Sequence, residues 1–165
     1  MRHFEFTADD EAGTEELGRA LAACLPEQMT IALYGTLGSG KTRLVQALAA
    51  ACGVPRETVV SPTFVLCHEY HGCRTLYHLD AYRLQTADEF WQIGAEEYFA
   101  SPALTLIEWA DRVQSCLPAE RLEIRAEVVS ETGRCFALTA RGAPCESVLD
   151  ALAARLERGG AEVRG

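Results

Sequence analysis

Lysine is almost absent from this 165-residue sequence, because Lys41 is the only lysine among 15 basic side chains and the others are arginine. The basic residues are outnumbered by 24 acidic ones, which gives a formal net charge of −9. This deficit of positive charge argues against broad contact with nucleic-acid phosphates, which requires a surface rich in lysine and arginine. The charge remains compatible with a basic protein partner, or with RNA that such a partner holds.

Long apolar runs are also absent. No run approaches the ~18 residues that a membrane-spanning helix needs, and residues 1–10 carry acids where a signal peptide would be basic and apolar. We therefore expect a cytoplasmic protein without a membrane partner, whose cysteines are reduced and mostly fill space in the core. Repeats, low-complexity tracts and linkers are missing as well, so the length predicts a single domain over residues 1–165.

Two cysteines and two histidines lie close together in residues 67–73, which raises the question of a zinc site. Four ligands from such a short stretch would need a very tight loop, whereas zinc sites usually draw their ligand pairs from two separated elements. A β-hairpin with its turn near Gly72 explains the same residues by alternation of side chains. We favour the hairpin and keep zinc as the alternative.

Apolar periodicity predicts strands that alternate with helices. The expected strands are residues 4–6, 30–34, 64–70, 74–79, 104–107, 122–129 and 135–139, and the expected helices are 15–25, 44–52, 87–93 and 148–156. Thr14 is the expected N-cap of the first helix. Gly53 and Pro55 are expected to end the second. This order predicts an α/β protein with a P-loop NTPase-like three-layer fold and a small, mostly parallel mixed sheet.

The single lysine lies in a complete phosphate-binding loop motif, GTLGSGKT, at residues 35–42. A predicted strand precedes the motif and a predicted helix follows it, which is the context that this motif needs. In such a loop, glycines let backbone N–H groups approach the phosphates, Lys41 bridges phosphate oxygens and Thr42 places its hydroxyl on Mg²⁺. The expected nucleotide contacts are Gly35, Thr36, Leu37, Gly38, Ser39, Gly40, Lys41 and Thr42.

Asp80 and Glu108 each follow a short apolar stretch that is predicted to be a strand. Because ligands of open α/β sheets gather at the carboxyl ends of strands, both carboxylates can reach the metal. Glu108 is the candidate for holding Mg²⁺, directly or through water, or for orienting the attacking water, with Asp80 as its partner. Thr63 is a candidate switch residue that senses the γ-phosphate, although Ser-Pro-Thr is also ordinary turn chemistry. Trp109 is expected to be a packing residue.

Together these residues resemble the TsaE family, small bacterial ATPases needed to make threonylcarbamoyladenosine in tRNA. The matching segments agree in order and spacing, and they are residues 14–18, 37–42, 61–64, 78–84, 94 with 98–99, and 108–109. The resemblance covers about residues 11–109, and the rest of the chain matches only in general shape. Arg43 departs from the family, in which a second threonine or serine is frequent, and little effect is expected from it.

The resemblance implies that ATP binds the loop, that Thr42 and Glu108 hold Mg²⁺ with help from Asp80, and that Thr63 belongs to a switch. It also implies further nucleotide contacts beside the loop, at the start of the first helix and in a late hairpin. These are Glu11, Thr14, Arg43, Gly133 and Arg134. The implied partners are TsaD and TsaB homologues, which carry the transfer chemistry. The chain would meet tRNA only through that complex, which ATP hydrolysis would reset.

Two other functions remain open. A kinase for a small metabolite shares the loop, but it needs an acceptor pocket and usually an arginine-bearing lid, and no lid segment is evident. A nucleotide switch that does not hydrolyse needs only the loop, whereas Asp80 and Glu108 together favour hydrolysis. No arginine is obviously placed as a finger in cis, so we expect slow turnover alone and stimulation by partners. A guanine signature is missing, since N-K-x-D would need a second lysine.

Overall fold

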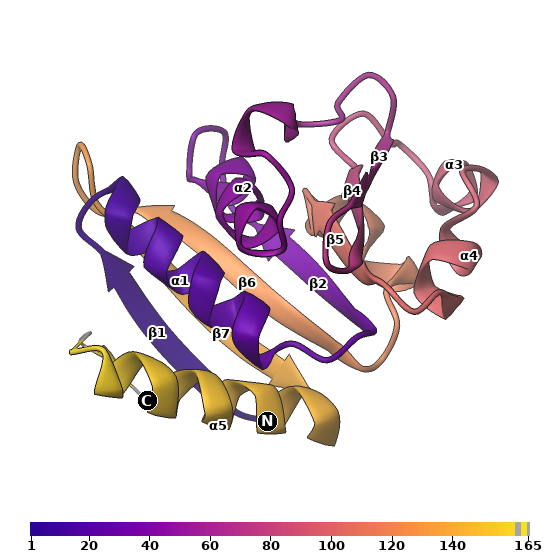
Figure 1. The fold of residues 1–165 in the computed structure, drawn as a ribbon. Coiled ribbons are helices and arrows are strands. Elements are labelled where there is room, and N and C mark those ends of the chain that lie inside the picture. Colours follow the sequence, from indigo (N-terminus) through magenta and orange to yellow (C-terminus); the bar gives the residue numbers. More distant parts are fainter. Residues whose placement is uncertain (161–162, 165) are drawn as a thin grey trace.

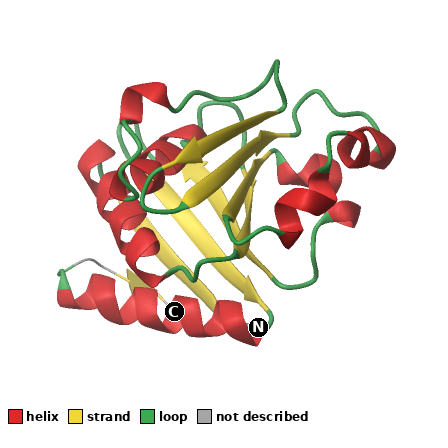
Figure 2. Cartoon of the chain, turned by 45° about the vertical axis from the view of Figure 1, so that its right-hand side comes forward, coloured by secondary structure: helices red, strands yellow, loops and turns green. Residues whose placement is uncertain are grey.

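The computed structural model describes residues 1–160 and 163–164 (Figures 1 and 2). In chain order the elements are β1 (His3–Ala8), α1 (Glu11–Cys24), β2 (Met29–Tyr34), α2 (Lys41–Ala51), the 3₁₀ helix η1 (Arg56–Thr58), β3 (Cys67–His71), β4 (Thr75–Asp80), α3 (Ala87–Gln92), α4 (Ala95–Ala100), β5 (Leu104–Glu108), the 3₁₀ helix η2 (Ala110–Cys116), β6 (Arg121–Val128), β7 (Arg134–Arg141), α5 (Ala143–Arg158) and β8 (Val163–Arg164).

The strands of the described residues form one sheet in the order β3-β4-β5-β2-β6-β7-β1-β8. The four neighbouring strands β4, β5, β2 and β6 run parallel. The outer pairings, β3 with β4, β6 with β7, β7 with β1 and β1 with β8, are antiparallel. Since β1 is antiparallel to β7, it points the same way as the parallel block. The prediction of a mixed, mostly parallel sheet is therefore confirmed.

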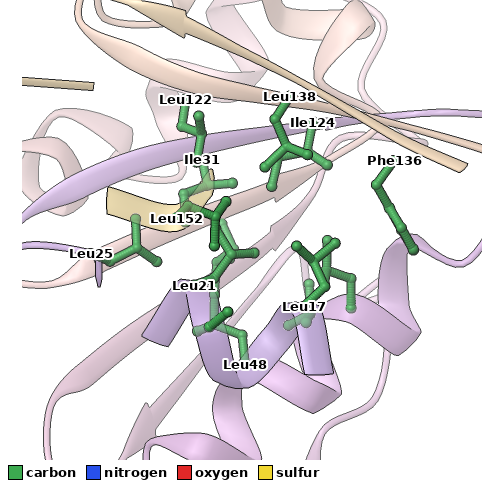
Figure 3. Close-up of a cluster of buried hydrophobic side chains, with 14 of the residues drawn as sticks. Leu17, Leu21, Leu25, Ile31, Leu48, Leu122, Ile124, Phe136, Leu138 and Leu152 are labelled. Atoms are coloured by element: carbon green, nitrogen blue, oxygen red, sulfur yellow. The ribbon is translucent and has the colours of Figure 1, made fainter. Parts of the chain in front are cut away.

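Helices cover both faces of the sheet, which gives the predicted three layers (Figure 1). The helices α1, α2 and α5 cover one face, and α3, α4 and η2 cover the other. In the first core, apolar side chains of the helices meet those of the central strands, and Figure 3 labels among them Leu17, Leu21, Leu48, Leu152, Ile31, Leu122, Ile124, Phe136 and Leu138. Strand β2 is buried throughout, as expected for a central parallel strand.

Helix α1 approaches α2, the helix that follows the glycine-rich loop, more closely than a side chain would allow. A Cβ at Gly18 would lie 2.5 Å from the Cβ of Ala47 and 2.7 Å from its carbonyl carbon. The overlap in Gly18→Ala is therefore expected to lower the free energy of unfolding by about 1–3 kcal/mol. The roughly 1 kcal/mol by which alanine is more favourable than glycine inside a helix offsets part of this loss. Chemical denaturation measures this loss.

The matched control for this prediction is Gly159→Ala, at the end of α5. There the nearest atom is the flexible carboxylate of Glu16 at 3.1 Å, which can move aside. We expect the control to change the free energy of unfolding by less than about 1 kcal/mol. Equal stability of the Gly18 variant and the wild type would show that α1 and α2 can move apart without cost.

The start of α1 differs from the prediction. Asp10 is the N-cap, because its side chain accepts a hydrogen bond from the backbone N–H of Gly13 at 3.0 Å. Thr14 is a buried residue inside the helix, so its assignment as the N-cap was wrong. Aspartate and threonine are both good N-caps. The apolar periodicity begins at Leu17, so it favoured Thr14 over the more distant Asp10.

The third predicted strand also begins later than expected. Residues 63–65 form a turn, Leu66 has a φ of +69° in the left-handed region, and β3 starts only at Cys67. From there the predicted hairpin is confirmed, because β3 pairs with β4 and Gly72 lies in the turn between them. Helix α4 was not predicted, and α5 begins five residues before the predicted helix. Among the described helices, none combines the length and apolar character needed to cross a bilayer.

Candidate functional site

A cavity of about 840 Å³ opens where β2, β4 and β5 end. Its volume falls in the range of small-molecule sites. Most residues predicted for the site line this cavity, and they are Glu11, Thr14, Leu37, Gly38, Ser39, Gly40, Lys41, Thr42, Arg43, Thr63, Asp80, Glu108 and Arg134. The remaining predicted residues, Gly35, Thr36 and Gly133, do not line it.

The loop between β2 and α2 has backbone angles that residues with a side chain rarely adopt. Gly35 and Gly40 have φ angles of +140° and +107°, and a Cβ at Gly35 would lie 2.5 Å from the carbonyl oxygen of Ala126. Helix α2 begins directly after this loop, and no side chain caps its first N–H groups. A free helix N-terminus with a cationic residue in its first turn is a ready-made anion site.

The ammonium group of Lys41 lies inside this loop. Its Nζ donates to the carbonyl oxygens of Gly35 at 2.7 Å and Thr36 at 2.9 Å. The ring of Trp109 covers it, with the centroid 4.2 Å from Nζ. Trp109 thus packs, as predicted, and its partners include the ring of Tyr82, 4.8 Å away between centroids, and the lysine itself through a cation–π contact. Gly35 and Thr36 thus reach the site through their carbonyl oxygens, and both residues line a neighbouring pocket instead of the main cavity.

Burial and nearby acids act on Lys41 in opposite directions. Burial lowers the pKa of Lys41, while the carboxylates of Glu108, Asp80 and Asp111 raise it. Burial is the larger effect, so the net pKa shift is downward. An anion bound beside Nζ would favour the charged form and oppose this shift.

Glu108, the last residue of β5, is almost fully buried and interacts with Thr42 at the start of α2. The Thr42 hydroxyl lies 2.8 Å from Oε1 and 3.0 Å from Oε2 of Glu108 and donates to the carboxylate. A third group completes the cluster, because His78 Nε2 lies 2.8 Å from Glu108 Oε1. The structure therefore brings together the two residues predicted to hold the metal and adds His78, which the site prediction had missed.

Asp80, the last residue of β4, holds the segment that contains Thr63. Its Oδ2 accepts hydrogen bonds from the hydroxyls of Ser61 at 2.6 Å and Thr63 at 2.8 Å. Its Oδ1 accepts one from the backbone N–H of Tyr82 at 2.8 Å. Asp80 and Thr63, predicted separately, are thus direct partners, and Asp80 fixes the loop over residues 61–63.

We expect Asp80→Asn to loosen this loop. The amide N–H₂ cannot accept, so the hydroxyls of Ser61 and Thr63 must turn round to accept from it, and the charge that strengthens these hydrogen bonds is lost, at a cost of about 1–3 kcal/mol. The melting temperature should fall by roughly 2–10 °C, and backbone amides of residues 61–65 should exchange their hydrogens faster. Asp111→Asn, an exposed acid of the same region, is the control. Unchanged hydrogen exchange at 61–65 would refute the anchoring role of Asp80.

Charged side chains from three separate segments meet at the rim of the cavity. Glu11 at the start of α1 pairs with Arg43 of α2 at 2.6 Å, and Glu15 pairs with Arg56 of η1 at 2.6 Å. Arg56 was not predicted, because η1 joins this cluster only through the packing of α2 against α1. The first pair is exposed and the second is half-exposed, so each stabilises the fold by at most about 1 kcal/mol. Arg43, for which little effect was expected, thus pairs with Glu11, another predicted nucleotide contact.

The turn between β6 and β7 closes the far side of the cavity. The guanidinium of Arg134 donates to the carbonyl oxygens of Gly133 at 2.8 Å and Gly38 at 3.5 Å. The predicted late hairpin is therefore in contact with the glycine-rich loop. Glu131 and Thr132 of the same turn also line the cavity and were not predicted. Nothing in their local sequence distinguishes them from ordinary turn residues.

Comparison with known proteins gives a consistent result. The profile of the family described as "Threonylcarbamoyl adenosine biosynthesis protein TsaE" matches residues 8–136. The chain is 39% identical to the "tRNA threonylcarbamoyladenosine biosynthesis protein TsaE" of Treponema pallidum, over 81% of this chain and 96% of that protein. It is 33% identical to the protein of the same description from Bacillus subtilis, over 92% of this chain and 95% of that one.

Among solved structures, the crystal structure of Bacillus subtilis YdiB is similar to this chain with a TM-score of 0.79. The two are 27% identical, and the similarity covers 93% of this chain and 96% of YdiB. Because it covers 93% of the chain, the common fold extends beyond residue 109, where the sequence resemblance was only general. The predicted P-loop-like α/β fold is confirmed, and the chain belongs to the TsaE family.

Proposed function

We propose that the chain is an Mg²⁺-dependent ATPase that acts with TsaD and TsaB homologues in forming threonylcarbamoyladenosine in tRNA, and that hydrolysis resets that complex. The observation that carries the ATPase proposal is the cluster of Lys41, Thr42 and Glu108 in one cavity. The family membership supports the tRNA part, because the relatives are named for that pathway.

The loop and helix α2 would bind the phosphates. The uncapped N–H groups of α2 supply donors, and Lys41 would exchange the carbonyl oxygens of Gly35 and Thr36 for phosphate oxygens. Burial strengthens the attraction between Lys41 and an anion, because the effective dielectric constant around it is low. Glu11, Thr14 and Arg134 surround the part of the cavity where the nucleoside would lie.

The oxygen atoms around the cavity fit Mg²⁺. Thr42, Glu108 and Asp80 offer a hydroxyl and two carboxylates, the hard ligands that Mg²⁺ prefers. Thr42 and Glu108 would hold the ion, and Asp80 would assist by fixing Thr63. When bound, Mg²⁺ neutralises charge that develops on the phosphates. Glu108 Oε2 accepts from one donor whereas Oε1 accepts from two, so Oε2 has the free capacity to orient a water.

The partners would contact the rim of this cavity. Leu37 in the loop and Phe64 beside Thr63 are large apolar side chains with 87% and 81% of their surface exposed. Exposed apolar groups next to a ligand site are typical of a protein interface. The net charge of −9 disfavours direct binding of tRNA. We therefore expect the partners, and not this chain, to bind the tRNA, and we expect the complex to act in the cytoplasm. The partners should also raise the slow ATP turnover of the chain alone.

A strain of Bacillus subtilis that lacks its own TsaE tests this proposal in cells. Expression of this chain should restore threonylcarbamoyladenosine in tRNA, measured by mass spectrometry of digested tRNA. The Lys41→Ala variant, expressed to the same level, should not restore it. Restoration by both chains would refute a role for nucleotide binding, and restoration by neither would refute the proposed place of this chain in the pathway.

A further inference from the structure

His78 is a buried titratable residue that the proposed function does not use. It lies in β4, two residues before Asp80, and its side chain has no exposed surface. Strand β4 runs parallel to β5 in a register that pairs Asp80 with Glu108. This register brings the imidazole under the carboxylate of Glu108, with His78 Nε2 at 2.8 Å from Oε1.

The direction of this hydrogen bond follows from the chemistry of the two groups. An ionised carboxylate only accepts, so the imidazole N–H on Nε2 donates to Glu108. The other ring nitrogen, Nδ1, is buried and has no hydrogen-bond partner among the described residues. An unpaired buried N–H costs more than an unpaired lone pair. The arrangement therefore favours a proton on Nε2 that is directed at Glu108.

Two donors hold the Glu108 carboxylate from different elements. Thr42 Oγ1 approaches both oxygens from the start of α2, and His78 approaches Oε1 from β4. With Thr42 alone, the carboxylate could rotate about its last torsion and remain hydrogen-bonded, because that hydroxyl contacts either oxygen. The donor on β4 removes this freedom and selects Oε2 as the oxygen left for a further ligand.

An aromatic ring from the neighbouring strand packs beside the imidazole. The ring of Tyr70 on β3 lies 6.3 Å from that of His78, centroid to centroid. The Tyr70 hydroxyl interacts with His68 Nδ1 at 3.0 Å and with the carbonyl oxygen of Val60 at 3.5 Å. Because Val60 immediately precedes the segment that Asp80 holds, the hairpin of β3 and β4 supports both carboxylates of the cluster.

We propose that His78 is a positioning residue that orients Glu108 toward the magnesium–nucleotide complex. This inference rests on the proposed nucleotide site and adds a residue to it. Groups that orient metal ligands commonly change metal affinity by about 10- to 100-fold when removed. A histidine that only fills space would have no such effect, and this difference makes the inference testable.

The test compares nucleotide affinity in magnesium with affinity in EDTA, by calorimetry with ADP and with a non-hydrolysable ATP analogue. His78→Leu keeps the bulk and removes the donor. We expect it to lose about 10- to 100-fold in magnesium and to match the wild type in EDTA. His78→Gln, whose amide N–H can reach Glu108, should recover most of the loss. His71→Leu, an exposed histidine on the same hairpin, is the matched control and should behave as the wild type.

Each outcome decides the inference. Equal affinity of His78→Leu and wild type in magnesium would overturn it, as would a glutamine variant that folds but fails to recover. If the leucine variant does not fold, His78→Asn replaces it, since its shorter amide cannot reach Glu108. If the wild-type chain binds magnesium–nucleotide without hydrolysing it, the proposed ATPase activity is refuted but the positioning role of His78 is not. A chain that binds no nucleotide would refute both.

Discussion

Replacing Lys41 with alanine is expected to weaken ATP binding by about 10- to 150-fold, the effect of losing a hydrogen bond to a charged group. Turnover should fall further, because charge on the phosphates grows during the reaction. The physical reason is that the Lys41 ammonium lies inside the loop, with Nζ 2.7 Å from the Gly35 carbonyl oxygen. Calorimetry with ATP and magnesium measures the affinity.

The arginine variant sharpens this prediction. Every other basic side chain of the protein is arginine, yet Lys41→Arg should not restore binding. The ring of Trp109 and the carbonyl oxygens of Gly35 and Thr36 enclose the ammonium, and the broader guanidinium does not fit between them. Arg155→Ala, far away on α5, serves as the control. Full affinity in the arginine variant would contradict the close fit that this structure assigns to lysine.

The second large effect is expected for Glu108→Gln. The amide keeps the size of the carboxylate and can still accept from Thr42 and His78, so the fold and ATP binding in EDTA should persist within a few-fold. Affinity in magnesium should fall by at least the roughly 10- to 100-fold expected for His78→Leu, because Glu108 itself would hold the ion. Turnover should fall by about 10²- to 10⁴-fold, the usual contribution of a group that positions or deprotonates the nucleophile. Phosphate release under saturating ATP measures this loss.

Glu69→Gln is the control for Glu108→Gln, because Glu69 is an exposed acid on β3, outside the cavity. Its turnover should equal that of the wild type. Unchanged turnover in Glu108→Gln would remove Glu108 from the mechanism and leave Asp80 as the remaining candidate acid. A loss of ATP binding by that variant in EDTA would show that the carboxylate also supports the loop itself, apart from any magnesium ion.

Much of the fold follows from local pattern. The glycine-rich loop could be placed because a short apolar strand, fixed motif spacing and helical periodicity after Lys41 agree with one another. The same local reasoning was wrong at residues 64–66, where an apolar run resembles a strand. There the chain turns instead, because Asp80 holds Ser61 and Thr63 and the chain must then enter β3 through the left-handed Leu66.

Some residues of the candidate site could be predicted from local sequence and others could not. Lys41, Thr42, Asp80 and Glu108 could be predicted because each lies in a motif or directly at the end of a strand. His78 could have been found, since alternation places it on the same face of β4 as Asp80. Its contact with Glu108, however, depends on the register between β4 and β5, which no local pattern specifies.

Part of the rim of the cavity could not be predicted: Glu11 and Arg43 were expected there, but Arg56 was not. Arg56 reaches Glu15 across 41 residues of sequence, and this distance is closed only by the packing of α1 against α2. The approach depends on Gly18, whose missing side chain has no recognisable signature in one sequence. Contacts of this kind are set by tertiary structure, whereas motifs report on chemistry within a few residues.

The most direct test of the account is phosphate release from ATP by the purified chain with magnesium, alone and with TsaD and TsaB homologues added. We predict slow release by the chain alone, a clear rise with the partners, and loss of both in Glu108→Gln. Release that is indifferent to the partners, or phosphate transfer only to a small-molecule acceptor, would contradict it and point to a kinase.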